Sequence, residues 1–258
     1  MPEERDESKP YDCFVAFMDI MGFKERLLRE GHEKINEMFE SMHPTIDALK
    51  KEALKLVENK EKRKSSKNTQ YFKQTSVFPV SFSDSIILFS SDDSKDSALD
   101  ITINAAVILS EAIKHEIPMK GAVAFGKMTI NKDESLYFGQ PLIDAYELHK
   151  ELEIYGVVLH HTTQKRFELL GMEDWFDSLL FVQYLIPMKS GKIRHHLVNW
   201  VSLVKNPQDS ISKLYGSVSG TPRKYVDNTL EFFHETEAKK QALFAELEKK
   251  GLIEKTKD

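Results

Sequence analysis

One apolar run, broken by a single acid and followed at once by a glycine, constrains the fold of this chain most. The run is Phe14-Val15-Ala16-Phe17-Met18-Asp19-Ile20. It predicts a buried strand, and because side chains alternate between the faces of a strand, Phe17 and Asp19 share one face. A carboxylate at the end of such a strand is costly to desolvate unless a positive group meets it. The run therefore predicts a core strand that ends in a cation-binding position.

A bend at Met21-Gly22-Phe23 follows this strand and opens a helix. The free N–H groups at a helix start form an anion site, and this one would suit a triphosphate. A simpler interpretation is that Asp19 caps the helix. Phe17, on the face of Asp19, could pack against a bound nucleotide, or it could be a plain core residue.

A second acid, Asp84, stands at a strand turn between Phe82 and the apolar run Ile86 to Phe89. If the two strands are neighbours, Asp19 and Asp84 converge. Carboxylate oxygens, with water and phosphate oxygens, suit Mg²⁺ or Mn²⁺. Two such ions can activate an attacking hydroxyl and stabilise a leaving oxygen. The alternative is that Asp84 only shapes a hairpin turn.

The remaining pattern predicts one domain of mixed helices and strands with a helical tail. Helices are expected at 23–42, 46–57, 98–113, 140–152, 163–170 and 222–250. Strands are expected at 74–90, as a pair joined at Ser83-Asp84, at 119–125 with a return strand at Gly126-Lys127, and at 155–159. A hairpin is expected from 179–188 and 193–201.

Composition and charge narrow the class of protein. Net charge is −5, so no overall basic footprint of nucleic-acid binding is present, and the basic run Lys60 to Lys67 reads as a solvated loop. No apolar run approaches the ~18 residues of a membrane span. The acidic N-terminus resembles no signal peptide. With one cysteine, Cys13, no intrachain disulfide is possible, and a cytoplasmic location is expected.

Other candidate residues are weaker. His160-His161 and His195-His196 are adjacent pairs, whose members point to opposite faces of a strand and chelate one ion poorly. Cys13 has no matched histidine and acid that would make it a nucleophile. Lys120 could hold a phosphate as a point charge, or it could be a surface lysine at a strand start.

The order of these motifs resembles the catalytic domain of class III adenylate and guanylate cyclases. The matching segments are Phe17-Met18-Asp19-Ile20-Met21-Gly22-Phe23, Ser83-Asp84, Met119 to Gly126 and Phe138 to Leu148. The resemblance implies an α+β fold with a ferredoxin-like βαββαβ core, a C-terminal hairpin and a helix. It divides the chain into a disordered lead-in (1–11), a catalytic domain (12–204) and a helical extension (205–258).

The resemblance also implies roles for single residues. Asp19, the Ile20 carbonyl and Asp84 would hold two Mn²⁺ or Mg²⁺ ions. Phe17, Gly22, Phe23 and Lys120 would contact a nucleoside triphosphate, with Lys120 also catalytic. Phe78, Val80, Leu136 and Tyr137 would line the base pocket. The family works as a head-to-tail homodimer, so Lys120 and the segment Leu136 to Phe138 would complete the neighbour's site.

The departures from the family pattern are specific. Ile143 and Glu147 stand where purine cyclases have a transition-state Asn and Arg, and Val80 stands near their adenine-reading Lys. The chain is more similar to the bacterial pyrimidine cyclases of the Pycsar antiphage system, in Ser83 to Ser85 and in Ala145 to Leu148. That similarity implies cyclisation of UTP or CTP and signalling to a separate cyclic-nucleotide-sensing effector, with no nucleic-acid or membrane partner. A purine cyclase and a catalytically inactive cyclase-like domain are the alternatives.

Overall fold

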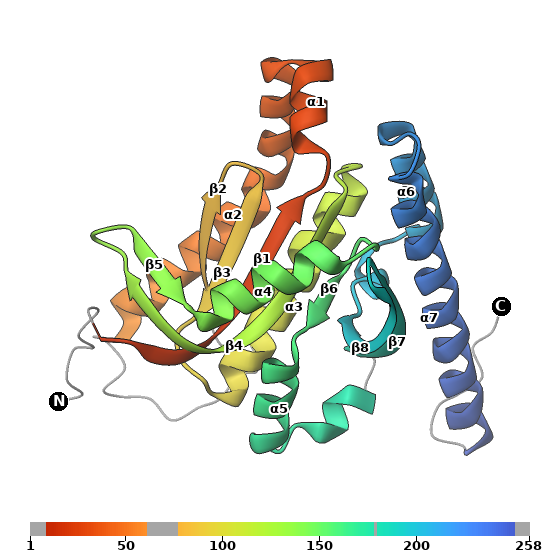
Figure 1. Cartoon of the computed structure of the whole chain (residues 1–258). Helices are drawn as coiled ribbons and strands as arrows, with labels where there is room; N and C mark the ends of the chain where they lie inside the picture. The colour runs from red at the N-terminus through yellow and green to blue at the C-terminus, as the bar shows by residue number, and fades with distance from the viewer. Residues whose placement is uncertain (1–8, 61–76, 178–179, 251–258) are drawn as a thin grey trace.

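The structure, a computed structural model, describes residues 9–60, 77–177 and 180–250 (Figure 1). The strands are β1 (Tyr11–Ile20), β2 (Val77–Phe82), β3 (Ser85–Ser90), β4 (Met119–Asn131), β5 (Leu136–Gly139), β6 (Val157–Leu159), β7 (Phe181–Met188) and β8 (Gly191–Val198). The helices are α1 (Phe23–Glu30), α2 (His32–Lys60), α3 (Lys95–Lys114), α4 (Gln140–Glu151), α5 (His161–Leu169), α6 (Pro207–Lys213) and α7 (Arg223–Lys249). Short 3₁₀ turns lie at Glu173–Asp177, Val201–Leu203 and Leu214–Ser217.

The first half of the chain folds as a ferredoxin-like βαββαβ unit. Its strands stand in the order β2-β3-β1-β4, and each pair of neighbours is antiparallel. The sheet continues through β6, which is parallel to β4, and then through β8 and β7, while β5 pairs with the far end of β4. The predicted α+β fold class, with its C-terminal hairpin and helix, is confirmed.

The two faces of β1 are covered differently. Phe14, Ala16, Met18 and Ile20 point to the face that packs against α2 and α3, called here the back face. Phe17 and Asp19 point to the opposite, front face, where α4 lies across β1 and β4. Figure 1 shows α4 in front of the sheet, with α2 and α3 behind it. The main core therefore lies behind the sheet, and the front face is only partly covered.

Local sequence signals explain where several helices begin and end. Ser94 caps α3, since its Oγ accepts a hydrogen bond from Ser97 N at 3.2 Å. Pro141 stands in the first turn of α4, where its missing N–H is harmless. Gly31, with φ of 83°, separates α1 from α2, so the break falls there. The helix expected to pause between 42 and 46 instead runs through Pro44.

One predicted turn is wrong. A return strand was expected at Gly126-Lys127, but β4 runs straight through both residues to Asn131. Gly126 has φ of 159°, which is extended backbone, and it pairs with Cys13 of β1. The pairing with β1 continues as far as Met128, so the strand runs on past Gly126, and the return strand, β5, comes later. The helix α6 was not predicted, while the basic segment 61–67 and residues 1–8, 74–76 and 179 lie outside the described residues.

The start of α7 is tied to the segment before β6. Tyr155 N donates to Thr229 Oγ1 at 3.0 Å, and Asn228 Nδ2 donates to the Glu153 carbonyl at 2.6 Å. Lys224 also forms an ion pair with Glu153. Across the described residues, none of the helices combines the length and the apolar character needed to cross a bilayer. The start of α7 is joined to the domain by one buried and two partly buried polar contacts.

Candidate active site

Strand register places Asp19 in a row of four side chains on the front face. Asp19 of β1 is opposite Ser85 of β3 and Lys120 of β4, and Ser85 is opposite Phe82 of β2. Side chains directly opposite one another in an antiparallel sheet point to the same face. The next row is Val80, Ile87, Phe17 and Ala122. The sheet therefore gathers residues from distant parts of the sequence around Asp19.

Asp84 is held beside the end of β1 by the main chain. Ile20 N donates to the Asp84 carbonyl at 3.0 Å. The preceding residue, Ser83, has φ of 55°, which makes the turn between β2 and β3 tight. Ser85 Oγ donates to Asp19 Oδ1 at 3.0 Å. The structure thus brings Asp19 and Asp84 together, and both side chains are half-buried.

The electrostatics of Asp19 favour a cation. The pKa of Asp19 is raised to about 6: burial is the largest cause and the nearby charge of Asp84 adds to it, while the Ser85 hydrogen bond and the Lys120 charge oppose the rise. Two partly buried carboxylates in each other's field are relieved by a divalent ion. Two carboxylates and the Ile20 carbonyl are oxygen donors of the kind that Mg²⁺ and Mn²⁺ prefer. Among the described residues, no group of three or more His, Cys, Asp or Glu side chains could hold a metal by itself, so water and phosphate oxygens would have to complete the coordination.

The start of α1 lies directly after the end of β1. Gly22 has φ of 69°, in the left-handed region that a glycine tolerates, and it is the residue before the helix. Met21 N donates to the Pro118 carbonyl at 2.7 Å, which fixes the bend. Phe23 begins α1 and packs against Phe39 of α2, with ring centroids 5.8 Å apart. The helix start is exposed at Gly22 and lies close in sequence to Asp19.

Lys120 lies inside the protein. Its side chain is 3% exposed, and its Nζ donates to the Leu152 carbonyl at 2.9 Å. The Nζ also lies 5.4 Å from the centroid of the Tyr225 ring of α7. Burial lowers the pKa of Lys120 to about 8, with a further contribution from Lys189. Its ammonium group is therefore already engaged beneath α7, in the same row as Asp19.

Three of the four expected base-pocket residues lie in one cluster on the front face. Phe78, Val80 and Tyr137 pack together around Phe89, and the Tyr137 and Phe89 rings stack at 5.5 Å. Leu136 is different, because alternation along β5 turns it away from Tyr137 and leaves it exposed. The structure therefore joins Phe78, Val80 and Tyr137, and does not join Leu136 to them.

Two residues of α4 were missed by sequence analysis. His149 Nε2 lies 4.0 Å from Asp19 Oδ2, and its ring packs against Phe17 at 4.7 Å. Tyr146 meets the Phe17 ring edge-on at 5.3 Å. The sequence contains a signal for an inward-facing His149, because Pro141, Ala145 and His149 recur every four residues, as on one face of a helix. The structure buries all three. A histidine at an inward position of an otherwise apolar stripe points to a specific partner.

The two histidine pairs have other contacts. His160 caps α5, since its Nδ1 accepts from Thr162 N at 3.4 Å. The His196 ring stacks on Phe176 at 4.3 Å. Cys13 is fully buried on the front side of β1 in an apolar cluster. His160, His196 and Cys13 therefore make contacts that stabilise the fold.

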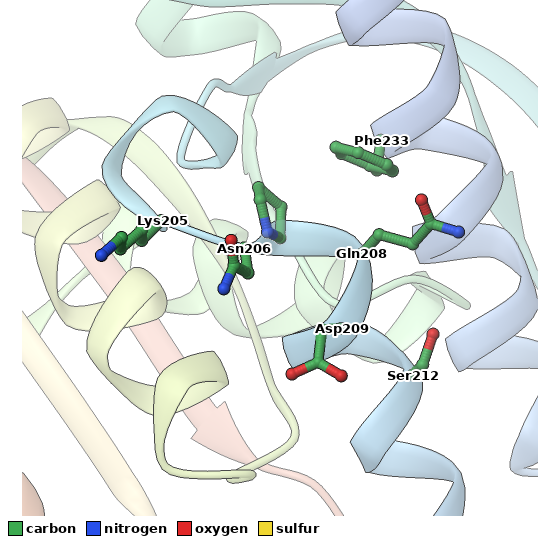
Figure 2. A pocket seen from close by; sticks show the side chains of 7 residues that line it. Lys205, Asn206, Gln208, Asp209, Ser212 and Phe233 are labelled. Carbon is green, nitrogen blue, oxygen red and sulfur yellow. The ribbon is translucent and has the colours of Figure 1, made fainter.

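A separate open pocket of about 510 Å³ lies between α6 and α7 (Figure 2). It is lined by Lys205, Asn206, Pro207, Gln208, Asp209, Ser212 and Phe233. In Figure 2, Phe233 projects from α7 and the other side chains come from α6 and the residues before it. None of these side chains is buried, and none belongs to the site around Asp19. The pocket lacks the desolvated ionisable groups that the carboxylate site has.

No protein-family model matches the chain, and no curated protein matches it. One similar solved structure is the catalytic core of a rhodopsin-guanylyl cyclase with converted specificity in complex with ATPalphaS, at 16% identity and a TM-score of 0.49. That match covers 74% of this chain and 96% of the other. Another is a class III adenylyl cyclase-like ATP-binding protein from Pseudomonas aeruginosa, at 12% identity and a TM-score of 0.37, covering 88% of this chain and 43% of the other. Both similarities are low, and the strand order itself shows the fold.

Proposed function

We propose that this protein is a nucleotide cyclase that uses two divalent metal ions. The observation that carries the proposal is the pair Asp19, at the end of β1, and Asp84, in the turn between β2 and β3, which are tied together by the hydrogen bond from Ile20 N to the Asp84 carbonyl. The raised pKa of Asp19, caused mainly by burial, fits a site that is completed by cations. The ordered motifs in the sequence support the same activity.

Each residue has a distinct role in this proposal. Asp19, the Ile20 carbonyl and Asp84 hold two Mn²⁺ or Mg²⁺ ions, which would supply the positive charge needed to activate the ribose 3′-hydroxyl and to stabilise the pyrophosphate leaving group. The exposed start of α1 at Gly22 and Phe23 offers N–H groups to the triphosphate. Phe17 forms an apolar wall beside Asp19. Lys120, opposite Asp19 on the same face, adds positive charge beside the site, although its ammonium donates to the Leu152 carbonyl.

The active form is proposed to be a homodimer with composite sites. The front face carries exposed apolar side chains around the carboxylate pair. They are Phe82 of β2 with Ile143 and Tyr146 of α4, while Leu136 and Phe138 are exposed on the opposite side of β5. Such a group of exposed apolar residues marks an interaction surface. A second copy of the chain, placed over this face, would bury the front-face residues and bring its own α4 and β5 to the site.

The proposed substrate is a pyrimidine nucleotide, with UTP preferred over CTP and both purines poor. Sites that read a base edge by hydrogen bonds need polar side chains, and they reject bases that leave those groups unpaired. Val80 and Phe78, on the front face, are apolar, while Tyr137 stacks on Phe89 within the same cluster. Such a pocket suits a smaller ring. The cyclic nucleotide would act as a second messenger for a separate effector in antiphage defence.

A second candidate is a nucleotide-binding domain without catalytic activity. The observation in its favour is that α4 exposes Ile143, and also Glu147, which pairs with Lys150. An acid at this position would repel a triphosphate rather than stabilise its developing charge. Binding of a nucleoside triphosphate without turnover would support this candidate.

Incubating the protein with each of the four nucleoside triphosphates and Mn²⁺, and identifying the products by mass spectrometry, tests these alternatives. The proposal expects cyclic UMP as the main product, and Asp19→Ala and Asp84→Ala should each abolish it. Asp12→Ala, at an exposed acid of the same strand, is the matched control and should keep activity. Cyclic AMP or cyclic GMP as the main product would reject the pyrimidine assignment, and no cyclic product with any substrate would reject the cyclase.

A further inference from the structure

The imidazole of His149 is built into the wall of the carboxylate site. The side chain comes from α4, is 5% exposed as a residue, and faces Asp19 across the front of the sheet. Its ring contacts Phe17 at 4.7 Å and Tyr146 at 5.1 Å, measured between centroids. With rings on two sides, the imidazole has little freedom to turn. Its two nitrogens therefore face different groups, Nδ1 the Tyr146 carbonyl and Nε2 the Asp19 carboxylate.

The partner of Nδ1 identifies the tautomer. Nδ1 lies against the carbonyl oxygen of Tyr146, one turn earlier on α4, and a carbonyl can only accept a hydrogen bond. Nδ1 therefore carries a proton and donates it. Nε2 lies 4.0 Å from Asp19 Oδ2, too far for a direct hydrogen bond, so no contact requires a second proton on Nε2. A neutral ring with its proton on Nδ1 presents a lone pair at Nε2, on the side of Asp19.

Nε2 of His149 and Oδ2 of Asp19 face each other, and both are hydrogen-bond acceptors. Their separation is 4.0 Å, which is too long for a direct hydrogen bond. A carboxylate and an imidazole lone pair repel one another unless a donor lies between them. Asp19 Oδ1 already accepts from Ser85. The geometry thus leaves Oδ2 and Nε2 to share a donor that is neither of these side chains.

We propose that His149 is a positioning residue for the metal site, whose Nε2 accepts a hydrogen bond from a water carried by the ion that Asp19 binds. This inference rests on the proposed function. The hydrogen bond would fix the water, and through it the orientation of Asp19 Oδ2. Residues that contact metal ligands or metal-bound water commonly change metal affinity about 10-fold to 100-fold when replaced. His149 would act through water and Asp19, without contacting the nucleotide.

The competing explanation is that His149 only fills space between Phe17 and Tyr146. His149→Phe separates the two explanations, because phenylalanine keeps a flat ring in the same place and removes both nitrogens. His149→Gln provides the conservative replacement, because its side-chain amide reaches the position of Nε2. His195→Phe, at a half-buried histidine of β8, is the matched control outside the site.

The experiment titrates the purified, metal-free protein with Mn²⁺ alone and measures free Mn²⁺ by electron paramagnetic resonance, with melting temperatures recorded in parallel. His149→Phe should bind Mn²⁺ about 10-fold more weakly than the wild type. His149→Gln should recover part of the affinity, and His195→Phe should bind as the wild type does. The melting temperature of metal-free His149→Phe should stay close to that of the wild type.

Equal Mn²⁺ affinity of His149→Phe and the wild type would overturn the positioning role while leaving the proposed function intact. A wild-type protein that binds no Mn²⁺ would overturn both. If His149→Phe does not fold, His149→Gln and His149→Asn carry the same comparison, because asparagine reaches the position of Nδ1 but not that of Nε2. Equal affinity in those two variants would then reject the inference.

Discussion

Ser85 Oγ donates a hydrogen bond of 3.0 Å to Asp19 Oδ1, across the pairing of β3 with β1. The bond joins the first residue of β3 to the end of β1, and Ser85 directly follows Asp84. Ser85 thus orients the carboxylate of Asp19 and is the chain neighbour of Asp84. The hydrogen bond also stabilises the charged form of Asp19, opposing the effect of burial on its pKa.

Ser85→Ala should raise the pKa of Asp19 further above its ordinary value, because the carboxylate loses a donor. The expected result is a Mn²⁺ affinity about 10-fold lower at neutral pH, with the midpoint of the pH dependence of binding moved upward. The measurement is Mn²⁺ titration between pH 5 and 8, a range set by the raised pKa of about 6. Ser81→Ala, at an exposed serine of β2, is the control. An unchanged midpoint would show that the hydrogen bond does not tune Asp19.

Asp19→Asn should stabilise the metal-free protein at high pH. The pKa of Asp19 is raised in the folded state to about 6, from 3.8, so the buried carboxyl favours its protonated form. Its contribution to stability is fully present below about pH 4 and is lost as pH rises through about 6. At pH 8 the free energy of unfolding of the wild type should therefore be lower than that of Asp19→Asn by on the order of 2 kcal/mol.

Chemical denaturation in the presence of a chelator, at several pH values, measures this difference. The difference in unfolding free energy between the wild type and Asp19→Asn should narrow steadily as pH falls from 7 toward 4.5. This window is set by the pKa of Asp19, about 6 in the folded state and 3.8 ordinarily. Asp12→Asn, at an exposed acid of β1, should show no such pattern. A constant gap at all pH values would mean that the titration of Asp19 is not its cause.

Thr229→Val should destabilise the protein by about 1–3 kcal/mol. The change keeps the shape of the side chain, but it leaves the buried N–H of Tyr155 without the Thr229 hydroxyl that accepts its hydrogen bond. Thermal or urea unfolding measures the loss. Thr221→Val, at an exposed threonine before α7, is the matched control and should change stability by less than about 0.5 kcal/mol. Equal effects of the two changes would argue against the docking of α7 through Thr229.

Ile143→Glu should weaken the proposed homodimer and reduce activity with it. Ile143 is 55% exposed on α4, and a charge placed in an apolar interface is costly to bury. Sedimentation velocity should show a shift toward the monomer, with a circular dichroism spectrum like that of the wild type. Ile103→Glu is the control, because Ile103 is 46% exposed on α3, behind the sheet. A wild-type protein that is monomeric and active would refute composite sites.

Local patterns were enough to predict β1, the turn at Ser83-Asp84 and α4. Alternation within β1 placed Phe17 and Asp19 on one face, and the short turn kept Asp84 at a strand end. Three features depend on tertiary contacts, and local patterns do not predict which elements meet in them. β4 continues past Gly126 because β1 pairs with it, His149 meets Asp19 because α4 lies across the front face, and Lys120 is buried because Tyr225 of α7 covers it.

The division of β1 into two faces has an evolutionary consequence. The residues that hold the domain together, such as Ala16 and Met18, point backward into the main core, while Val80 and Phe78 belong to the edge strand β2 and line the front. Substitutions of these half-buried side chains leave the back-face packing untouched. If they line the base pocket as proposed, ligand preference can diverge between descendants through a few changes on one strand, while the inherited scaffold and its carboxylate pair stay the same.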